Sequence, residues 1–109
     1  MATKRDAAGQ LMLGGLRLGA LSDLGDCPTP FYVYDVDGIV AEAKAMHAAF
    51  DDAPHLVAYA VKANTSGTIV RALAEAGCGA DVVSGAELEV ALACGIAPSK
   101  IVYSGVAKK

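Results

Sequence analysis

Hydrophobic and polar positions alternate between two kinds of spacing over the second half of the chain. Short, mostly apolar blocks at residues 56–61, 80–83 and 101–103 are typical of strands that are buried on both faces. Between these blocks, apolar residues recur at the three- and four-residue spacing of an amphipathic helix. Strand, helix, strand, helix, strand at intervals of some twenty residues predicts a βαβ series and a parallel sheet.

Small and polar residues mark the ends of the two predicted helices. Ser66 is placed to cap the first helix and Gly77 to close it. Ser84 and Glu87 form a capping-box pattern at the start of the second helix, which should stop at Gly95. The side chains expected to face the core are Ile69, Val70, Leu73 and Ala74 in the first helix and Leu88, Ala91 and Leu92 in the second.

The first half of the chain has a less regular pattern. Residues 1–27 are rich in glycine and leucine without a clear period and predict a loosely structured lead-in. The segment TPFYVYD, residues 29–35, has the β-branched and aromatic residues of a strand. A helix should follow, capped by Asp35 or Asp37 and ended by Pro54. Its apolar face is expected to contain Ile39, Ala43, Met46 and Phe50.

Length and composition limit the possible fold and partners. The 109 residues, 54% of them hydrophobic, can form a core, but a closed eight-unit barrel takes about 250 residues. The series ends after its third strand, so we expect a fragment of a longer protein. A net charge of -3 without a basic stripe argues against nucleic-acid binding. The longest apolar run has six residues, far short of the roughly 20 that a membrane-spanning helix needs.

The sequence offers little support for a metal site, a nucleotide-binding loop or a catalytic histidine. The three cysteines lack the spacing of metal ligands and predict reduced thiols in a cytoplasmic protein without a metal site. The glycines around Cys78 precede a strand instead of opening a helix, which argues against dinucleotide binding. A phosphate loop at residues 105–109 lacks its upstream glycine. Neither His47 nor His55 has a carboxylate at a spacing typical of a catalytic pair, and we interpret both as non-catalytic.

Lys62 is the strongest candidate for chemistry. It falls at the carboxyl end of a predicted parallel strand, where α/β barrels assemble their active sites. Alternation places Ala58, Ala60 and Lys62 on one face, and the two methyl groups would leave room for a bound ring. An amine held there, away from full hydration, would be a nucleophile able to bond an aldehyde. The alternative is an ordinary solvated lysine at a strand end.

Four stretches resemble a known family in order and spacing. They are YAVKAN at 59–64, TPFYVYD at 29–35, GADVVSGAELEVAL at 79–92 and KIVYSGVAKK at 100–109. Together they resemble the alanine-racemase-like, pyridoxal-phosphate-dependent decarboxylases, and especially the members that act on diaminopimelate. Ala86, Ala107 and Lys109 depart from the family pattern, which has glycine at the first two of these positions and a hydroxyl residue at the third.

The resemblance implies a fold and a cofactor. The chain would be the incomplete amino-terminal part of a (β/α)8 TIM barrel that binds pyridoxal 5'-phosphate, with an initial strand from a separate β domain. Residues 28–54 would be that strand and a linking helix, and residues 55–109 the first barrel units. Lys62 would hold the cofactor covalently and act as the catalytic residue, with Ala60 and Asp81 beside the cofactor.

The resemblance also implies an activity. The full-length enzyme would decarboxylate meso-2,6-diaminopimelate to L-lysine as a cytoplasmic homodimer, while the fragment alone would be inactive and poorly stable. An ornithine- or arginine-type decarboxylase is the alternative within this class; such enzymes tend to carry cysteine where Ala63 stands. Two other hypotheses remain. The protein could be a non-catalytic relative that binds the cofactor and regulates, or a generic α/β segment whose lysine is incidental.

Overall fold

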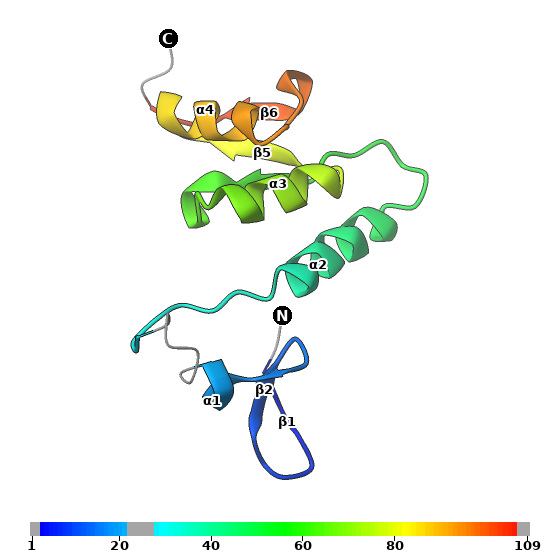
Figure 1. Cartoon of the computed structure of the whole chain (residues 1–109). Helices are drawn as coiled ribbons and strands as arrows, with labels where there is room; N and C mark the ends of the chain where they lie inside the picture. The colour runs from blue at the N-terminus through cyan, green and yellow to red at the C-terminus, as the bar shows by residue number, and fades with distance from the viewer. Residues whose placement is uncertain (1–2, 22–27, 107–109) are drawn as a thin grey trace. The chain divides into compact units, whose positions relative to one another are not determined.

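A computed structural model describes residues 3–21 and 28–106 of the chain (Figure 1). The chain forms two compact units, residues 1–39 and residues 40–109. Their boundary falls inside a helix, whereas the sequence places one after residue 54. The domain organisation derived from the sequence therefore stays a prediction.

The first unit contains a small antiparallel sheet. Its strands are β1 (Lys4–Arg5), β2 (Leu11–Leu13) and β3 (Leu16–Arg17), followed by the short helix α1 (Leu18–Leu21). Gly14 and Gly15, both at positive φ, form the two-residue loop between the paired residues Leu13 and Leu16. The prediction of a loosely structured lead-in was therefore wrong for residues 3–21, because these glycines allow a tight hairpin. Residues 22–27 of that lead-in lie outside the described part of the chain.

The predicted strand at residues 29–35 is not formed. Residues 31–35 have no strand assignment, and neither sheet in the described part of the chain includes them. A strand exists only through the hydrogen bonds of a neighbour, and Pro28 and Pro30 each lack one backbone donor. Local β propensity was thus not enough without a partner strand.

The helix that follows, α2 (Val36–Ala49), begins where the sequence predicts. The Gly38 backbone N–H donates to Asp35 Oδ1 over 3.0 Å, so Asp35 is the capping residue. The helix ends at Ala49, before Pro54, and the chain turns through Asp51 at a φ of 52°. Of the expected apolar face, Ala43 is buried, whereas Met46 and Phe50 are 58% and 48% exposed.

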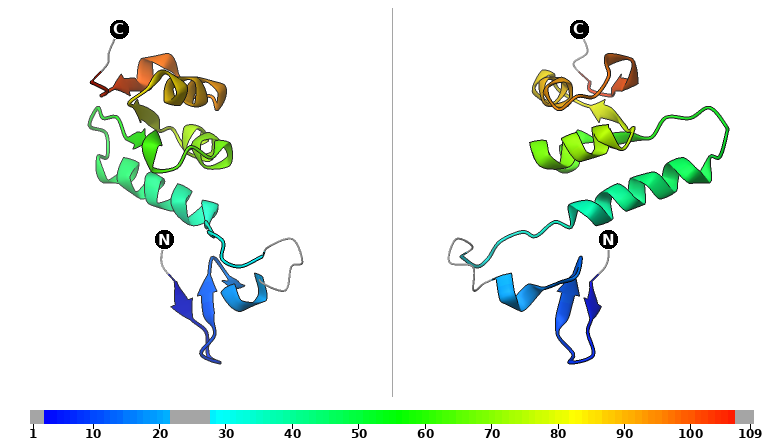
Figure 2. Two further views of the ribbon diagram at one scale, coloured as in Figure 1. Left: turned by 90° about the vertical axis from the view of Figure 1, so that its left-hand side faces the viewer. Right: turned by 45° about the vertical axis from the view of Figure 1, so that its right-hand side comes forward.

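The second unit confirms the predicted βαβ series. Strands β4 (Ala58–Ala60), β5 (Gly79–Val82) and β6 (Ile101–Tyr103) form a parallel sheet in that order. Helices α3 (Gly67–Glu75) and α4 (Gly85–Ala93) connect them and lie on one side of the sheet (Figure 2). The remaining elements are two short 3₁₀ helices, η1 (Val61–Ala63) and η2 (Pro98–Lys100). Within the described ranges, no helix combines the length and the apolar character needed to cross a membrane.

The core lies between the sheet and the two helices. Val70 of α3 and Ala91 of α4 pack with Ala80 and Val82 of β5, and all four side chains are fully buried. Val61, Cys94 and Ile96 complete this cluster. The predicted inward face of α3 is confirmed for its three largest residues, Ile69, Val70 and Leu73. In α4, Leu92 is 45% exposed, and Val90 packs against the core instead.

Both helices end as the glycines predict. Gly77 and Gly95 have φ values of 91° and 95°, which place each in the left-handed region just after a helix. The two residues after the α3 cap return their N–H groups to the helix, Gly77 to the Ala74 carbonyl and Cys78 to the Leu73 carbonyl, over 3.0 Å each. Gly95 and Ile96 repeat this pattern after α4, bonding the carbonyls of Leu92 and Ala91.

The two helix starts differ. Glu87 N–H donates to the Ser84 hydroxyl oxygen over 3.2 Å, which confirms the serine half of the predicted capping box. The Glu87 carboxylate accepts from the backbone N–H of Val83, one residue before the cap. Ser66 occupies the N-cap position of α3 without a capping bond from its side chain.

Replacing Gly95 should test the left-handed helix end. A Cβ at this position meets no atom within 4 Å, so only the backbone conformation opposes a side chain. We expect Gly95→Ala to lower the free energy of unfolding by about 1 kcal/mol, and Gly95→Asn by less, because asparagine enters this region more readily. Urea unfolding of the two variants measures the difference. Equal stabilities for Ala, Asn and Gly at this position would contradict the assignment.

Candidate active site

The face of the sheet opposite the helices carries the predicted site residues. Ala60, Asp81 and Val102 are register partners across β4, β5 and β6 and so form one row across the sheet. The neighbours of these residues, including Tyr59 and Val82, belong to or pack against the core on the helix side. Successive side chains of a strand point to opposite faces, so the row lies on the face that α3 and α4 do not cover. The structure therefore brings Ala60 and Asp81 together.

Lys62 lies beyond the carboxyl end of β4 and not within the strand. It belongs to η1, so the predicted continuation of strand alternation through Leu56–Val61 and on to Lys62 was wrong. The preceding Val61 is fully buried in the core, whereas Lys62 is exposed. Within the described ranges its ammonium has no hydrogen-bond or ion-pair partner.

The predicted shielding of Lys62 from water is also absent in this chain. Three parallel strands form an open sheet, and the β4 edge pairs with no further strand in the described residues. A barrel encloses its mouth only when all its strands are joined, because the loops that surround the site come from different strands. The position of Lys62 at the strand end is thus set locally, while any enclosure depends on further strands.

Hydrogen bonds fix the turn that carries Lys62. The Tyr59 hydroxyl donates to the Asn64 carbonyl oxygen over 2.8 Å, which ties the last strand residues to the end of the turn. The Asn64 backbone N–H closes η1 on the Val61 carbonyl over 3.1 Å. The Asn64 side-chain oxygen then accepts from the Ser66 N–H at the start of α3. The lysine is held between a strand and a helix that are both anchored in the core.

Removing the Tyr59 hydroxyl should loosen this turn. Tyr59→Phe keeps the ring that packs on the core and deletes the bond to Asn64, so we expect a loss of about 1 kcal/mol in stability. Tyr103→Phe is the matched control, because that ring also packs on the core and the described residues offer its hydroxyl no partner. Thermal unfolding of the two variants measures the effect. Equal unfolding midpoints would contradict a role for the Tyr59 hydroxyl.

Ser104 is a hydrogen-bond partner of the predicted site residue Asp81 that the sequence pattern does not reveal. Its hydroxyl donates to Asp81 Oδ1 over 2.7 Å, across the carboxyl ends of β5 and β6. Asp81 is half-buried and is the one charged residue within the three strands β4, β5 and β6. A serine just after a strand does not by itself indicate a hydrogen-bond partner. The register of β5 and β6 is what brings Ser104 next to Asp81.

A second polar cluster lies away from this face. His55 Nδ1 is 2.8 Å from the Ala53 carbonyl oxygen, and His55 Nε2 is 3.0 Å from His47 Nδ1. His47 Nε2 is in turn 3.8 Å from the Cys78 sulfur. Burial raises the pKa of the Cys78 thiol, although the charge of Lys100 acts in the opposite direction. The histidines thus bond each other and not a predicted site residue, and the described residues contain no group of three or more metal-binding side chains.

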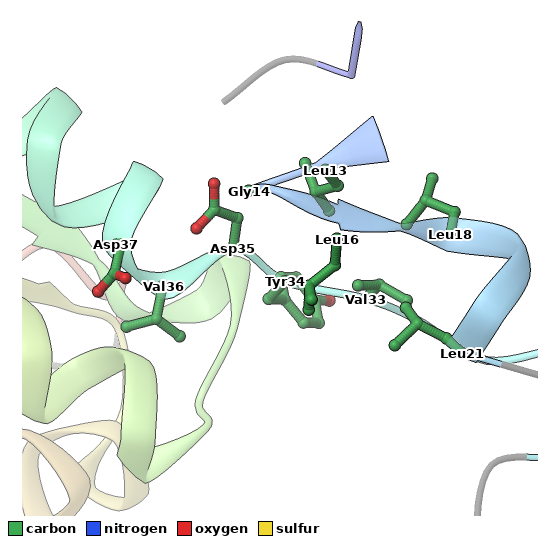
Figure 3. A pocket seen from close by; sticks show the side chains of 10 residues that line it. All are labelled: Leu13, Gly14, Leu16, Leu18, Leu21, Val33, Tyr34, Asp35, Val36 and Asp37. Carbon is green, nitrogen blue, oxygen red and sulfur yellow. The ribbon is translucent and has the colours of Figure 1, made fainter. Parts of the chain in front are cut away.

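A pocket of about 300 Å³ lies in the first unit (Figure 3). Leucine and valine side chains form much of its wall, and Asp35 and Asp37 contribute carboxylates. Asp35 already caps α2, and a Cβ on Gly14 would come within 2.9 Å of its carboxyl carbon. The pocket contains none of Lys62, Ala60 or Asp81, so it does not coincide with the predicted site.

The site residues fit a pyridoxal group by their chemistry. Lys62 offers an exposed amine without a partner in the described part of the chain, which is the group an aldehyde needs. Ala60 is small, and Asp81 supplies a carboxylate on the same face. These residues supply an amine, open space and one carboxylate on a face of the sheet that α3 and α4 do not cover.

Comparison with known proteins also indicates a pyridoxal-binding protein. Residues 36–109 match the family described as pyridoxal-dependent decarboxylase, pyridoxal binding domain. The chain is 43% identical over 100 residues to a diaminopimelate decarboxylase of Pseudomonas fluorescens, and 45% identical over 100 residues to that of Aquifex aeolicus. Each alignment covers 92% of this chain but only 24% and 23% of the relative. The chain therefore spans about a quarter of the length of these curated relatives.

Solved structures agree with the fold. The crystal structure of AQ1208 from Aquifex aeolicus matches 98% of this chain with a TM-score of 0.84 and 42% identity, over 26% of its own chain. Diaminopimelate decarboxylase from M. jannaschii, in co-complex with L-lysine, matches 99% of this chain with a TM-score of 0.82 and 32% identity, over 26% of its own chain. The parallel sheet is thus an incomplete amino-terminal part of a larger α/β fold, and the chain belongs to the pyridoxal-dependent decarboxylases, with their pyridoxal binding domain at residues 36–109.

Proposed function

We propose that this chain is the amino-terminal part of a pyridoxal-phosphate-dependent enzyme that decarboxylates meso-2,6-diaminopimelate to L-lysine. The observation that carries the proposal is the place of Lys62 at the carboxyl end of the first strand of a parallel sheet, with an amine that has no partner among the described residues. The names of the relatives support the substrate, since the alignments to diaminopimelate decarboxylases span nearly the whole chain. L-lysine is present in the M. jannaschii structure that matches this fold.

Lys62 is proposed to bind the cofactor covalently through its Nζ atom. Hydrogen bonds of Tyr59 and Asn64 fix the turn that carries Lys62. The lysine side chain therefore starts from a defined point at the edge of the sheet. Ala60, two residues earlier, keeps the adjacent surface low enough for a flat ring to lie over it. Asp81, the register partner of Ala60, is proposed to place its carboxylate beside that ring.

When bound, pyridoxal phosphate supplies a ring that accepts the electrons left behind as carbon dioxide departs. The protein's part is binding, orientation and proton handling. Lys62 would hold the cofactor and, whenever its Nζ atom is not bonded to it, could carry a proton for the bound substrate. The Asp81 carboxylate is proposed to help orient the bound cofactor through its negative charge.

The remaining features are proposed on the same basis. We propose that the full-length enzyme is a homodimer and acts in the cytoplasm, on a small amino-acid substrate. The open edges of the β4–β6 sheet support a further proposal, that residues 1–109 alone do not catalyse decarboxylation. The loops around a closed barrel mouth come from many strands, and the described part of this chain supplies three parallel ones.

A substrate assay tests the proposed function. The full-length protein, loaded with pyridoxal phosphate, is given meso-diaminopimelate, ornithine or arginine, and released carbon dioxide and the product amine are measured. We expect L-lysine from meso-diaminopimelate and little turnover of the other two. Preferential decarboxylation of ornithine or arginine would overturn the substrate, and cofactor binding without any decarboxylation would favour a regulatory relative. Residues 1–109, assayed in parallel, should release no carbon dioxide.

A further inference from the structure

The Asp81 carboxylate is held on one of its two oxygens. Oδ1 accepts the Ser104 hydroxyl over 2.7 Å, close to the length of a charge-assisted O–H···O⁻ bond. Oδ2 has no hydrogen-bond partner among residues 3–21 and 28–106. Because a carboxylate is planar, fixing one oxygen also restricts the direction of the other. Asp81 therefore presents one oxygen to whatever lies over the uncovered face of the sheet.

Ser104 is itself held firmly. Its backbone N–H donates to the Val82 carbonyl over 2.9 Å, which continues the β5–β6 ladder just past the last strand residue, Tyr103. This backbone bond and the regular pairing of Asp81 with Val102 already join the two strands. The side-chain bond is not needed for strand pairing, so its effect falls on the orientation of Asp81.

We propose that Ser104 is a positioning residue that turns the Asp81 carboxylate toward bound pyridoxal. The inference rests on the proposed function, since it requires the cofactor to lie over Ala60 and Asp81. Ser104 acts through Asp81 and needs no contact with the cofactor itself. Without the hydroxyl, the Asp81 side chain gains rotational freedom, and part of its interaction with the cofactor is lost.

The test uses the full-length protein with three serine variants. Ser104→Ala deletes the hydroxyl, and Ser104→Thr retains one on the same backbone. Ser99→Ala is the matched control, because Ser99 is an exposed serine on the same segment whose hydroxyl has no partner within the described ranges. The readouts are the dissociation constant for pyridoxal phosphate and the visible circular dichroism of the bound cofactor, which reports how asymmetrically it is held.

We expect Ser104→Ala to weaken cofactor binding about tenfold, equal to about 1.4 kcal/mol, and to change the visible circular dichroism. Ser104→Thr should restore both quantities, and Ser99→Ala should change neither. A purely structural role would lower the thermal unfolding midpoint of the apoprotein and leave the circular dichroism of bound cofactor unaltered. That pattern, or native binding and dichroism in Ser104→Ala, would overturn the inference.

A double-mutant cycle separates this inference from the proposed function. In an Asp81→Ala background, Ser104→Ala should have no further effect on the dissociation constant, because the hydroxyl then has nothing to orient. A persisting tenfold effect would show that Ser104 acts without Asp81 and would overturn the inference alone. A protein that binds no pyridoxal phosphate, or whose Asp81→Ala variant binds it normally, would overturn the placement of Asp81 and the inference with it.

Discussion

Lys62→Ala should lower the decarboxylation rate of the full-length protein more than about 10³-fold. The substitution removes the amine that is proposed to attach the cofactor and to carry a proton, and loss of a proton-transfer group alone costs about 10²- to 10⁴-fold. Lys62→Arg should be similarly inactive, because arginine keeps the positive charge but its guanidinium is not a nucleophile. Steady-state measurement of carbon dioxide release gives the rates.

Lys44→Ala is the control for this experiment. Lys44 is another exposed lysine, on α2, and makes no hydrogen bond or ion pair within the described residues. Its replacement should leave the rate within about twofold of the native value, as for most surface substitutions. A Lys62→Ala rate of a tenth or more of the native rate would contradict the catalytic role, because loss of a covalent attachment should lower the rate far more than tenfold.

Gly79→Ala should cause the largest loss of stability. A Cβ at Gly79 would overlap the Lys100 carbonyl oxygen and approach Leu56 Cδ1 to 2.9 Å, so the β5 backbone would have to move away from its neighbours. Gly79 pairs with Ala58 at the start of β5, and the shift would pass into the core strand that carries Asp81. We expect a cost of about 3 kcal/mol, the upper part of the range for overpacking.

Gly85→Ala is the matched comparison for Gly79→Ala. Its Cβ would meet no atom within 4 Å, and its position at the first turn of α4 favours alanine over glycine. The unfolding free energy should stay unchanged or rise slightly. Urea denaturation of the two full-length variants measures both effects. A Gly79→Ala protein as stable as Gly85→Ala would contradict the close packing of β5 on the segment before β6.

The parallel sheet could be predicted because its signals are local. Gly77 and Gly95 end the helices in the left-handed conformation that few other residues adopt, and Ser84 caps the second helix. These residues divide the chain into strand and helix without knowledge of tertiary contacts. The third strand accordingly begins at Ile101, as the sequence predicts.

Failed predictions trace to interactions that a local pattern does not contain. The segment at residues 31–35 has strand propensity but no partner strand in either described sheet. Leu92 lies on a helix whose covered face is set by the sheet and not by hydrophobicity alone, so it is exposed. The hairpin at Gly14 and Gly15 did have a local signal, two glycines between leucines, and could have been recognised from the sequence.

The candidate site was predictable in part. Lys62 was singled out by its place at the end of a predicted strand, whereas the placement of Ala60 and Asp81 beside a cofactor is implied by the family resemblance and stays a prediction. The exposure of Lys62 did not follow, because enclosure depends on strands beyond the three of this sheet. Ser104 was not foreseeable, since its importance rests on the register that brings it to Asp81.

Borohydride reduction followed by peptide mapping tests the central claim most directly. The full-length protein is loaded with pyridoxal phosphate, reduced and digested with trypsin, which cannot cleave after a modified lysine. The account predicts an uncleaved peptide of residues 45–71 that carries the reduced cofactor on Lys62. Cleavage after an unlabelled Lys62, with the cofactor on another lysine or on none, would contradict it.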